Sequence, residues 1–399
     1  MSGAWLHVIG IGEDGLDGLP PASRAALEGA EVVIGGERHQ TLTDGLSAER
    51  LTWPSPFSAM IGTIRSYAGR QTAIVVTGDP LWFSAGEAIA AEFAPEDVRF
   101  YPHVSAFQLA CARMGWSIRS VATLSIHGRP ASRILPDVRP GARLVVLTSG
   151  GQTPAEVARL LTFQGYGPSR LTVLADMGGP TEYRIAGVAE SWEEIAPDFH
   201  TLCIECEAAE GTAILPRGPG LPDDAFVHDG KITKQEVRAV TLARLAPERR
   251  ALLWDIGCGC GSVSVEWMRM APYARAIGIE PDAARRDMTL RNAEALGAPA
   301  LELVAGAAPD ALAGLEAPDA VFIGGGLSKE TVSACLAALK PHGRLVANAV
   351  TLESEQLLAD LQATYGGALC RLAVSRAEPV GRYRGWRPFM PVTQWSFSL

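Results

Sequence analysis

The segment WDIGCGCGSVSVEW, residues 254–267, combines residue types that could bind a charged ligand. An apolar run ends in Asp255, and Gly257, Gly259 and Gly261 follow at alternate positions. Glycines let a backbone turn sharply and approach a ligand closely. An acid just before such a loop repels a pyrophosphate, whereas it suits a ligand that carries a cationic amino-acid group.

The spacing of this loop separates two kinds of cofactor. A dinucleotide fingerprint needs G-x-G-x-x-G, but this loop reads D-x-G-x-G-x-G. S-adenosylmethionine (SAM) has a sulfonium, an ammonium and no phosphate, so it fits better. Glu280 ends the next predicted strand, where a carboxylate can accept hydrogen bonds from both ribose hydroxyls. Together these features predict a class I SAM-dependent methyltransferase; an ordinary strand–helix turn is the alternative.

Two cysteines within the loop, Cys258 and Cys260, raise the question of a metal site. Zinc needs about four ligands, and the sequence offers no second pair or histidine cluster nearby. Cys203 and Cys206 form a C-x-x-C inside a predicted strand, where they face opposite sides. We therefore expect no metal and interpret Cys258 and Cys260 as small loop fillers.

The elements that position these residues follow an α/β pattern. Strand-like apolar runs alternate with amphipathic helical windows, as in folds with largely parallel sheets, and 399 residues favour two domains. A stretch rich in Pro and Gly, 210–230, predicts a linker between domains 1–209 and 231–399.

Two local features of the second domain carry specific predictions. Thr233 followed by Glu236 predicts a capping box at the start of a helix. At the C-terminus we expect two strands, near 368–376 and 390–398, separated by an arginine-rich loop.

Composition excludes several classes of protein. The formal net charge of −9 argues against a nucleic-acid partner, because phosphate contacts need a basic surface. No apolar run is long enough to span a bilayer, and the N-terminus lacks the basic region of a signal peptide. Seven irregularly spaced cysteines favour a reduced, cytoplasmic protein.

The first half offers weaker motifs. HVIGIGEDG (7–15) places alternate glycines after a strand, but no acid precedes them, so a structural turn explains it equally well. TGDPLWFSAG, PHVSAFQLACARMGW and SIHGRP each lie where a predicted strand meets a loop, which is where α/β folds bind ligands.

These motifs carry a family resemblance. Residues 1–209 resemble the tetrapyrrole methylases, a class III SAM-dependent fold of two α/β lobes, in VIGIGEDG, TGDP, HVSAFQLACARMGW and SIHGR, the last typical of the CbiE-like subgroup. Residues 231–399 are similar to CbiT-like precorrin methylases, with a Rossmann-like class I fold, in DGKITKQEVRA, DIGCGCGSVSVEW, GIEPD, FIGGG and VANAVTLE. The two domains in this order resemble the bifunctional, CobL-type precorrin methyltransferases of cobalamin biosynthesis.

For the first domain the resemblance implies SAM in a cleft between the lobes. The residues it places there are Gly10, Gly12, Asp79, Pro80, Ser105, His127 and Gly128. His127 is also a candidate for substrate binding, and a structural histidine is the equal alternative. The chain departs from the commoner family pattern at Glu13–Asp14, where Pro–Gly often follows the first glycines.

For the second domain the resemblance implies a SAM site built on the D-x-G-x-G-x-G loop and Glu280. Its further members would be Gly306 and Ala307 beside the adenine, Gly324 toward the macrocycle, and Thr233 and Lys234 closing over the cofactor. Lys231 and Arg238 are candidates for substrate carboxylates, although charged residues here could equally form a solvated helix face.

The implied activity is methylation of C5 and C15 of a precorrin macrocycle, with loss of CO2 from the ring C (C12) acetate, from precorrin-6B to precorrin-8x. We expect one SAM per domain, a precorrin partner and homo-oligomers, with no nucleic-acid or membrane partner. The sequence assigns no catalytic acid or base, so orientation of the reactants would dominate. The alternatives are an NAD-dependent precorrin reductase and a SAM-binding regulatory protein.

Overall fold

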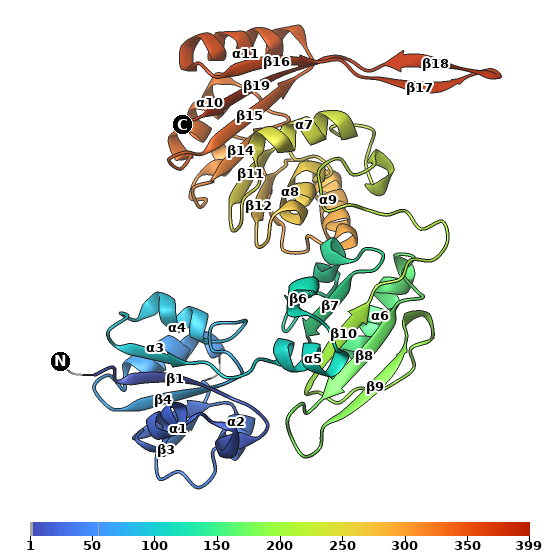
Figure 1. Ribbon diagram of the computed structural model, residues 1–399. Helices are drawn as coiled ribbons and strands as arrows, with labels where there is room; N and C mark the ends of the chain where they lie inside the picture. Colours follow the sequence, from blue (N-terminus) through green and yellow to red (C-terminus); the bar gives the residue numbers. More distant parts are fainter. Residues whose placement is uncertain (1–2, 55) are drawn as a thin grey trace. The chain divides into compact units, whose positions relative to one another are not determined.

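A computed structural model describes residues 3–54 and 56–399. It forms two compact units (Figure 1). One unit contains the chain up to Ala131 and Arg139–Thr212, and the other contains Ser132–Val138 and Ala213–Leu399. The predicted α/β class is confirmed in both units.

The first lobe of the first unit is built on a parallel five-stranded sheet in the order β3-β2-β4-β1-β5. Its strands are β1 (Leu6–Ile11), β2 (Val32–Gly35), β3 (Glu49–Thr52), β4 (Thr72–Thr77) and β5 (Val98–Tyr101). Its helices are α1 (Pro21–Glu28), α2 (Glu37–Leu42), α3 (Met60–Arg65) and α4 (Gly86–Glu92). Alternate residues of β1 enter different hydrophobic clusters, Val8 one and Ile9 the other. Burial on both faces explains why these strands read as continuous apolar runs.

The second lobe is mixed rather than parallel. Its sheet has the order β6-β7-β10-β8-β9, and only β6 and β7 pair in parallel. The strands are β6 (Ala122–Ser125), β7 (Arg143–Leu147), β8 (Arg170–Ala175), β9 (Tyr183–Val188) and β10 (His200–Glu205), with helices α5 (Ala106–Met114) and α6 (Thr153–Phe163). Because β10 is antiparallel to both β7 and β8, its first residues lie at the edge where those two strands end.

The second unit has a seven-stranded sheet in the order β13-β12-β11-β14-β15-β19-β16. Its strands are β11 (Leu252–Ile256), β12 (Arg275–Ile279), β13 (Glu302–Val304), β14 (Ala320–Ile323), β15 (Arg344–Ala349), β16 (Ala368–Leu372) and β19 (Val392–Ser398). Its helices are α7 (Gln235–Leu245), α8 (Ser262–Met270), α9 (Ala283–Leu296), α10 (Lys329–Ala338) and α11 (Leu352–Tyr365). The chain builds outward from β11 to β13 and then returns to β14, so the β11–β14 boundary is a topological switch point, where open α/β sheets bind ligands.

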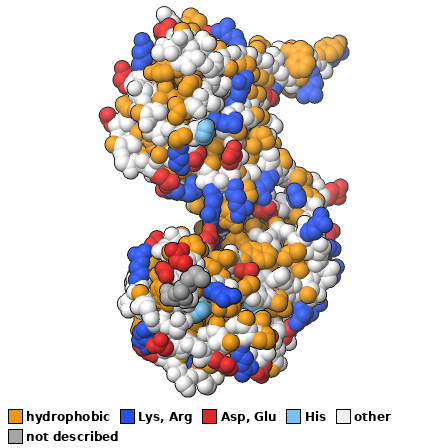
Figure 2. Space-filling model, turned by 60° about the vertical axis from the view of Figure 1, so that its left-hand side comes forward, with side chains coloured by type: hydrophobic (Ala, Val, Ile, Leu, Met, Phe, Trp, Pro, Cys, Tyr) orange, Lys and Arg blue, Asp and Glu red, His pale blue; other side chains and the backbone are white. Residues whose placement is uncertain are grey.

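The prediction of an arginine-rich loop near the C-terminus is wrong. The segment forms a β-hairpin of β17 (Ser375–Val380) and β18 (Tyr383–Pro388), which projects beyond the main sheet (Figure 1). Its outer part carries exposed apolar side chains beside arginines (Figure 2), and Trp386 is 77% exposed. Strands are predicted from the alternation of apolar and polar residues, and the arginines of this segment interrupt that pattern.

The start of the second unit also differs from expectation. Within the predicted linker, Leu221 and Phe226 are buried in the hydrophobic core of this unit. The predicted capping box is wrong: α7 has Lys234 at its N-cap without a side-chain cap, and Glu236 instead accepts hydrogen bonds from Arg376. The ion pair with Arg376 thus takes the carboxylate that the capping box would have used.

Among the residues that the structure describes, no helix is both long and apolar enough to cross a membrane.

Candidate functional site

The glycine loop of the second unit lies at the switch point between β11 and β14. Gly257, Gly259 and Gly261 all have positive φ, at 68°, 60° and 75°, a region that only glycine adopts freely. A Cβ on Gly257 would lie 2.8 Å from the Cα of Gly325, in the loop after β14. The alternate glycines therefore permit both a left-handed turn and close contact between the two loops.

Asp255 lies at the end of β11 and is buried, with 1% of its surface exposed. Its Oδ2 accepts hydrogen bonds from the backbone N–H of Ser264 at 3.1 Å and from its hydroxyl at 2.7 Å. Its Oδ1 is buried without a partner. Burial raises the pKa of Asp255 to about 6, against the opposing hydrogen bonds from Ser264. A buried carboxylate oxygen without a partner is costly, so this atom marks a place for a cationic donor.

Glu280 follows β12 and is also buried, at 3% exposure. Its Oε2 accepts a hydrogen bond from the N–H of Gly259 at 2.9 Å, and its Oε1 accepts one from the N–H of Asp282 at 3.1 Å. Each carboxylate oxygen has two lone pairs. Glu280 is therefore fixed against the glycine loop and still has acceptor capacity for a diol.

The remaining predicted cofactor residues of the second unit lie in the loops around this edge. Gly306, after β13, has φ 146°, and the carbonyl of Ala307 accepts a hydrogen bond from Ala311. Gly324 follows β14, and its N–H donates to Ile256. These residues share the edge of the sheet with Asp255, and their role in cofactor binding stays a prediction.

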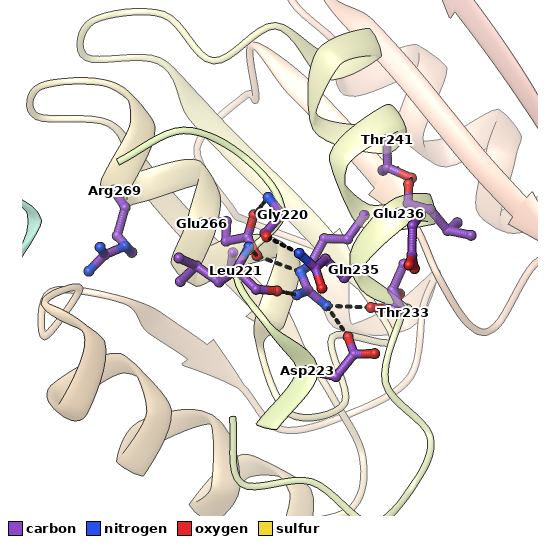
Figure 3. A network of polar contacts seen from close by, with 12 residues as sticks. Gly220, Leu221, Asp223, Thr233, Gln235, Glu236, Thr241, Glu266 and Arg269 are labelled. Carbon is purple, nitrogen blue, oxygen red and sulfur yellow. Dashed lines mark hydrogen bonds and ion pairs between the residues drawn. The ribbon is translucent and has the colours of Figure 1, made fainter. Parts of the chain in front are cut away.

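Lys231 and Arg238, the two cationic residues predicted to bind substrate carboxylates, differ from each other in their surroundings. Lys231 is exposed, and its carbonyl oxygen lies 3.8 Å from the position of a Cβ built on Gly259, so its backbone runs beside the glycine loop. Arg238 is fully buried. It donates hydrogen bonds to Glu266 at 2.6 Å, to Asp223 at 3.3 Å, and to two backbone carbonyls (Figure 3).

The predicted role of Arg238 in binding a substrate carboxylate is therefore wrong. Its guanidinium is used inside the protein, where it fastens the segment around Leu221 to α7 and α8 (Figure 3). Glu266 completes the network by accepting from the N–H groups of Gly220 and Leu221. The carbonyl of Thr233 is another acceptor for Arg238, so the predicted cofactor-closing segment is anchored by this network.

The cysteines of the loop have the packing role that we predicted. Cys258 and Cys260 are buried, and burial raises the pKa of both thiols. Within residues 3–54 and 56–399, no group of three or more His, Cys, Asp or Glu side chains could hold a metal ion.

In the first unit, the end of β1 and the loop after β4 pack closely against each other and against the segment before α5. A Cβ on Gly10 would lie 1.8 Å from the carbonyl oxygen of Gly78, and a Cβ on Gly78 would lie 2.9 Å from the Cα of Ser105. Larger residues at Gly10 and Gly78 would force these backbones apart. Gly10 and Gly78 are thus required by the close approach of three chain segments.

A small cavity of about 30 Å³ lies between the two lobes of this unit. Of the predicted residues only Gly12 lines it; the others in its wall are Ile11, Glu13, Thr77, Gly78, Val104, Ala106, Leu109, Leu174, Met177, Phe199, His200 and Thr201. Sequence analysis missed Phe199, His200 and Thr201, since they begin a strand rather than end one. The antiparallel direction of β10 brings its first residues to this edge.

Other predicted residues of the first unit have internal partners. Ser105 caps α5 by accepting from the N–H of Gln108 at 3.3 Å, and Asp79 accepts from the N–H of Leu81 at 2.8 Å. The carbonyl of Pro80 packs against the backbone of Gly86. His127 and Gly128 are tied to the loop after β7, through the carbonyl of Thr148 and the hydroxyl of Ser149.

The second unit fits SAM on its own geometry. Asp255 offers a buried anionic oxygen to a cation, Glu280 offers acceptors to ribose hydroxyls, and the glycine loop admits a ligand close to the backbone. Nothing in this arrangement favours a pyrophosphate, because two carboxylates face the loop.

Two family models divide the chain. "Tetrapyrrole (Corrin/Porphyrin) Methylases" matches residues 5–192, and "Precorrin methyltransferase domain" matches residues 224–399. The fold and sites thus define a two-domain methyltransferase, with a tetrapyrrole methylase followed by a precorrin methyltransferase domain.

Curated relatives specify the family. A precorrin-6Y C(5,15)-methyltransferase [decarboxylating] from Sinorhizobium sp is 44% identical over 99% of this chain and 96% of its own length. A cobalt-precorrin-7 C(5)-methyltransferase from Salmonella typhimurium is 30% identical over 43% of this chain and 84% of its own length. A probable cobalt-precorrin-6B C(15)-methyltransferase (decarboxylating) from Pyrobaculum calidifontis is 37% identical over 44% of this chain and 93% of its own length.

The chain belongs to the precorrin-6Y C(5,15)-methyltransferase (decarboxylating) family of cobalamin biosynthesis. Membership of this family implies SAM as the methyl donor. It also replaces the reductase and regulatory alternatives that the sequence motifs left open.

Proposed function

We propose that the two units divide the family's chemistry. The first unit methylates C5, and the second methylates C15 and removes CO2 from the ring C acetate, so that precorrin-6B becomes precorrin-8x. Each unit binds its own SAM. The single-domain relatives support this division, since a C(5)-methyltransferase and a C(15)-methyltransferase each cover less than half of the chain.

The buried Oδ1 of Asp255 is the observation that carries the second SAM site. An ionised carboxylate without a partner is tolerated where a ligand supplies the missing donor. The ammonium group of SAM is such a donor, and Glu280 holds the ribose at the other side of the glycine loop.

The chain's residues mainly orient the reactants. SAM supplies an electrophilic methyl group, and an electron-rich carbon of the reduced macrocycle is nucleophilic without a strong base. Asp255 and Glu280 fix both ends of the cofactor, which leaves the macrocycle to be aligned by the loops after β14 and β15. Correct alignment can contribute on the order of 7–11 kcal/mol to catalysis.

Decarboxylation asks for a different environment. The departing carboxylate must be desolvated beside a conjugated system that accepts electrons, so apolar walls serve it better than an ion pair. Arginines and lysines should hold the carboxylates that are retained. Lys231, exposed beside the glycine loop, is the candidate from our sequence analysis that stays available for this role.

Self-association through the β17–β18 hairpin belongs to the same proposal. An isolated two-stranded ribbon is marginally stable in water, and this one exposes Val380, Tyr383 and Trp386. A second copy that covers these side chains would stabilise the ribbon. Deletion of the hairpin should then lower the mass measured by light scattering.

Mass spectrometry of the products tests the division of labour. The full chain is incubated with precorrin-6B and methyl-labelled SAM, alongside Gly12→Val and Glu280→Ala. The wild-type chain should add two labelled methyl groups and release one CO2. Gly12→Val, which adds a side chain at the wall of the first cavity against Asp14 and His103, should lose only the C5 methyl group, and Glu280→Ala should lose C15 methylation and decarboxylation. Loss of both methyl groups in both variants would contradict the division.

A further inference from the structure

An ion pair at the cavity of the first unit has no role in the function described so far. Arg38, on α2, pairs with Glu13, which follows β1. It also donates a hydrogen bond to the hydroxyl of Thr77, at the end of β4, at 2.5 Å. His39 contacts the same hydroxyl through Nε2 at 3.0 Å. A cation is therefore held where the ends of two neighbouring strands meet.

The second lobe adds an aromatic contact to this cation. The guanidinium carbon of Arg38 lies 3.8 Å from the centre of the Phe199 ring, well within the range of a cation–π interaction. Glu13, Thr77 and Phe199 all line the cavity. Arg38 is thus held by three residues that border the site where we place the C5 reaction.

Stabilisation of the fold is a poor explanation for this arrangement. Burial lowers the pKa of Arg38 to about 10, so the side chain stays charged at neutral pH while losing much of its hydration. The ion pair itself is only partly buried, with 30% of the Arg38 side chain and 16% of the Glu13 side chain exposed, and partly exposed pairs usually contribute little stability. An arginine at a cavity is better explained by a ligand that needs its planar, bidentate donor groups.

We propose that Arg38 binds a carboxylate side chain of the macrocycle in the first unit, and that Glu13 holds the guanidinium until the substrate displaces it. The proposal rests on the assignment of C5 methylation to this unit. The acetate and propionate arms of the substrate supply the carboxylates. Phe199 fixes the plane of the guanidinium. The hydroxyl of Thr77 accepts one hydrogen bond from Arg38 throughout, while the substrate carboxylate replaces Glu13 as the other partner.

The proposal gives opposite roles to the two members of one ion pair. Arg38 attracts the substrate, whereas Glu13 competes with it and repels its carboxylates. A purely structural ion pair would make removal of either partner harmful in the same direction. The sign of the two effects therefore separates substrate binding from structural support.

The test uses the full chain, in which the second unit is an internal control. The first-site substrate is the macrocycle that Gly12→Val leaves without a C5 methyl group. Arg38→Met should raise the KM of C5 methylation for this macrocycle roughly tenfold to hundredfold, the effect of losing a hydrogen bond to a charged group. Arg38→Lys keeps the positive charge but lacks the two parallel donor groups of the guanidinium, so its KM should lie between those of the wild type and Arg38→Met. Glu13→Gln should lower this KM severalfold.

Two controls separate the possible failures. The rate of C15 methylation and the affinity of the first unit for SAM should stay at wild-type values in every variant. If the Arg38 variants fail to fold in the first unit, which loss of SAM binding by that unit would report, the effect of Glu13→Gln decides alone. A KM that rises or stays constant in Glu13→Gln, or that stays constant in Arg38→Met, overturns the proposal. A wild-type chain that never methylates C5 instead overturns the proposed function.

Discussion

The two candidate sites of this chain are built on opposite principles. The second-unit site lies at one edge of one sheet, where Asp255 lies at the end of β11 and Glu280 follows the adjacent parallel strand β12. The first-unit cavity lies between two sheets, and its wall combines the ends of β1 and β4 with the start of the antiparallel β10. A single-sheet site needs few long-range contacts, whereas a site between lobes depends on how both lobes close.

The difference also appears in the electrostatics. The second site keeps a buried carboxylate oxygen without a partner, ready for a cation. The first cavity has its acid, Glu13, already paired with Arg38. We infer that the second site is preorganised for the cofactor and that the first exchanges partners when substrate arrives.

The largest expected effect comes from Glu280→Ala, which removes the proposed ribose acceptor and leaves the N–H of Gly259 without its partner. Two hydrogen bonds to a charged group are worth about 3–6 kcal/mol, so C15 methylation should fall roughly hundredfold to ten-thousandfold. C5 methylation should persist. Glu302→Gln, on the exposed pair with Arg275, is the matched control and should change neither rate.

Arg238→Met should destabilise the second unit by about 3–5 kcal/mol, because it leaves the buried Glu266 without its counter-ion. Calorimetry of the full chain should show one unfolding transition lowered and the other unchanged. Arg376→Met, whose partners Asp223 and Glu236 are less buried, should cost about 1 kcal/mol. Equal losses in the two variants would show that the buried network of Figure 3 is not the main anchor.

The buried Asp255 predicts a stability that depends on pH. Its pKa is raised from 3.8 to about 6, so the free folded state prefers the protonated form. The contribution of protonated Asp255 to the free energy of unfolding is therefore fully present below pH 3.8 and is lost as the pH rises through 6. At neutral pH the loss amounts to about 3 kcal/mol. Asp255→Asn should therefore raise the stability of the cofactor-free second unit and abolish its SAM binding. Denaturation curves at pH 5 and 8 measure the first effect.

The same group predicts proton release on binding. A cation at Oδ1 favours the ionised form, so SAM binding near pH 6 should release about half a proton from Asp255, with Glu280 as the other acid nearby. Titration calorimetry in buffers of different ionisation enthalpy measures this. Absence of proton release when SAM binds the second unit near pH 6 would contradict this assignment.

The smallest effect is expected from Cys258→Ala. Its thiol fills space beside Gly278 and lies 4.0 Å from the hydroxyl of Thr289, so its loss should cost about 1 kcal/mol of stability. Both methylation rates should keep their wild-type values, with or without a chelator. A rate that falls with a chelator would restore the metal interpretation of the C-x-C loop.

The sequence predicts the single-sheet site of the second unit better than the cavity between the two lobes of the first unit. Asp255, the alternate glycines and Glu280 lie within a short stretch of parallel β–α units, so their spacing alone indicated their arrangement. Phe199 and His200 could not be found in this way, because only the antiparallel pairing of β10 brings a strand's beginning to the site. Arg238 was misassigned, since nothing local reveals that Glu266 and Asp223 would bury its charge.

The most direct test of two separate SAM sites is the number of SAM molecules bound per chain, measured by titration calorimetry of the full chain. The account predicts two for the wild type and one for Glu280→Ala, with the remaining site at its wild-type affinity. A single SAM per wild-type chain, or loss of both in Glu280→Ala, would contradict it.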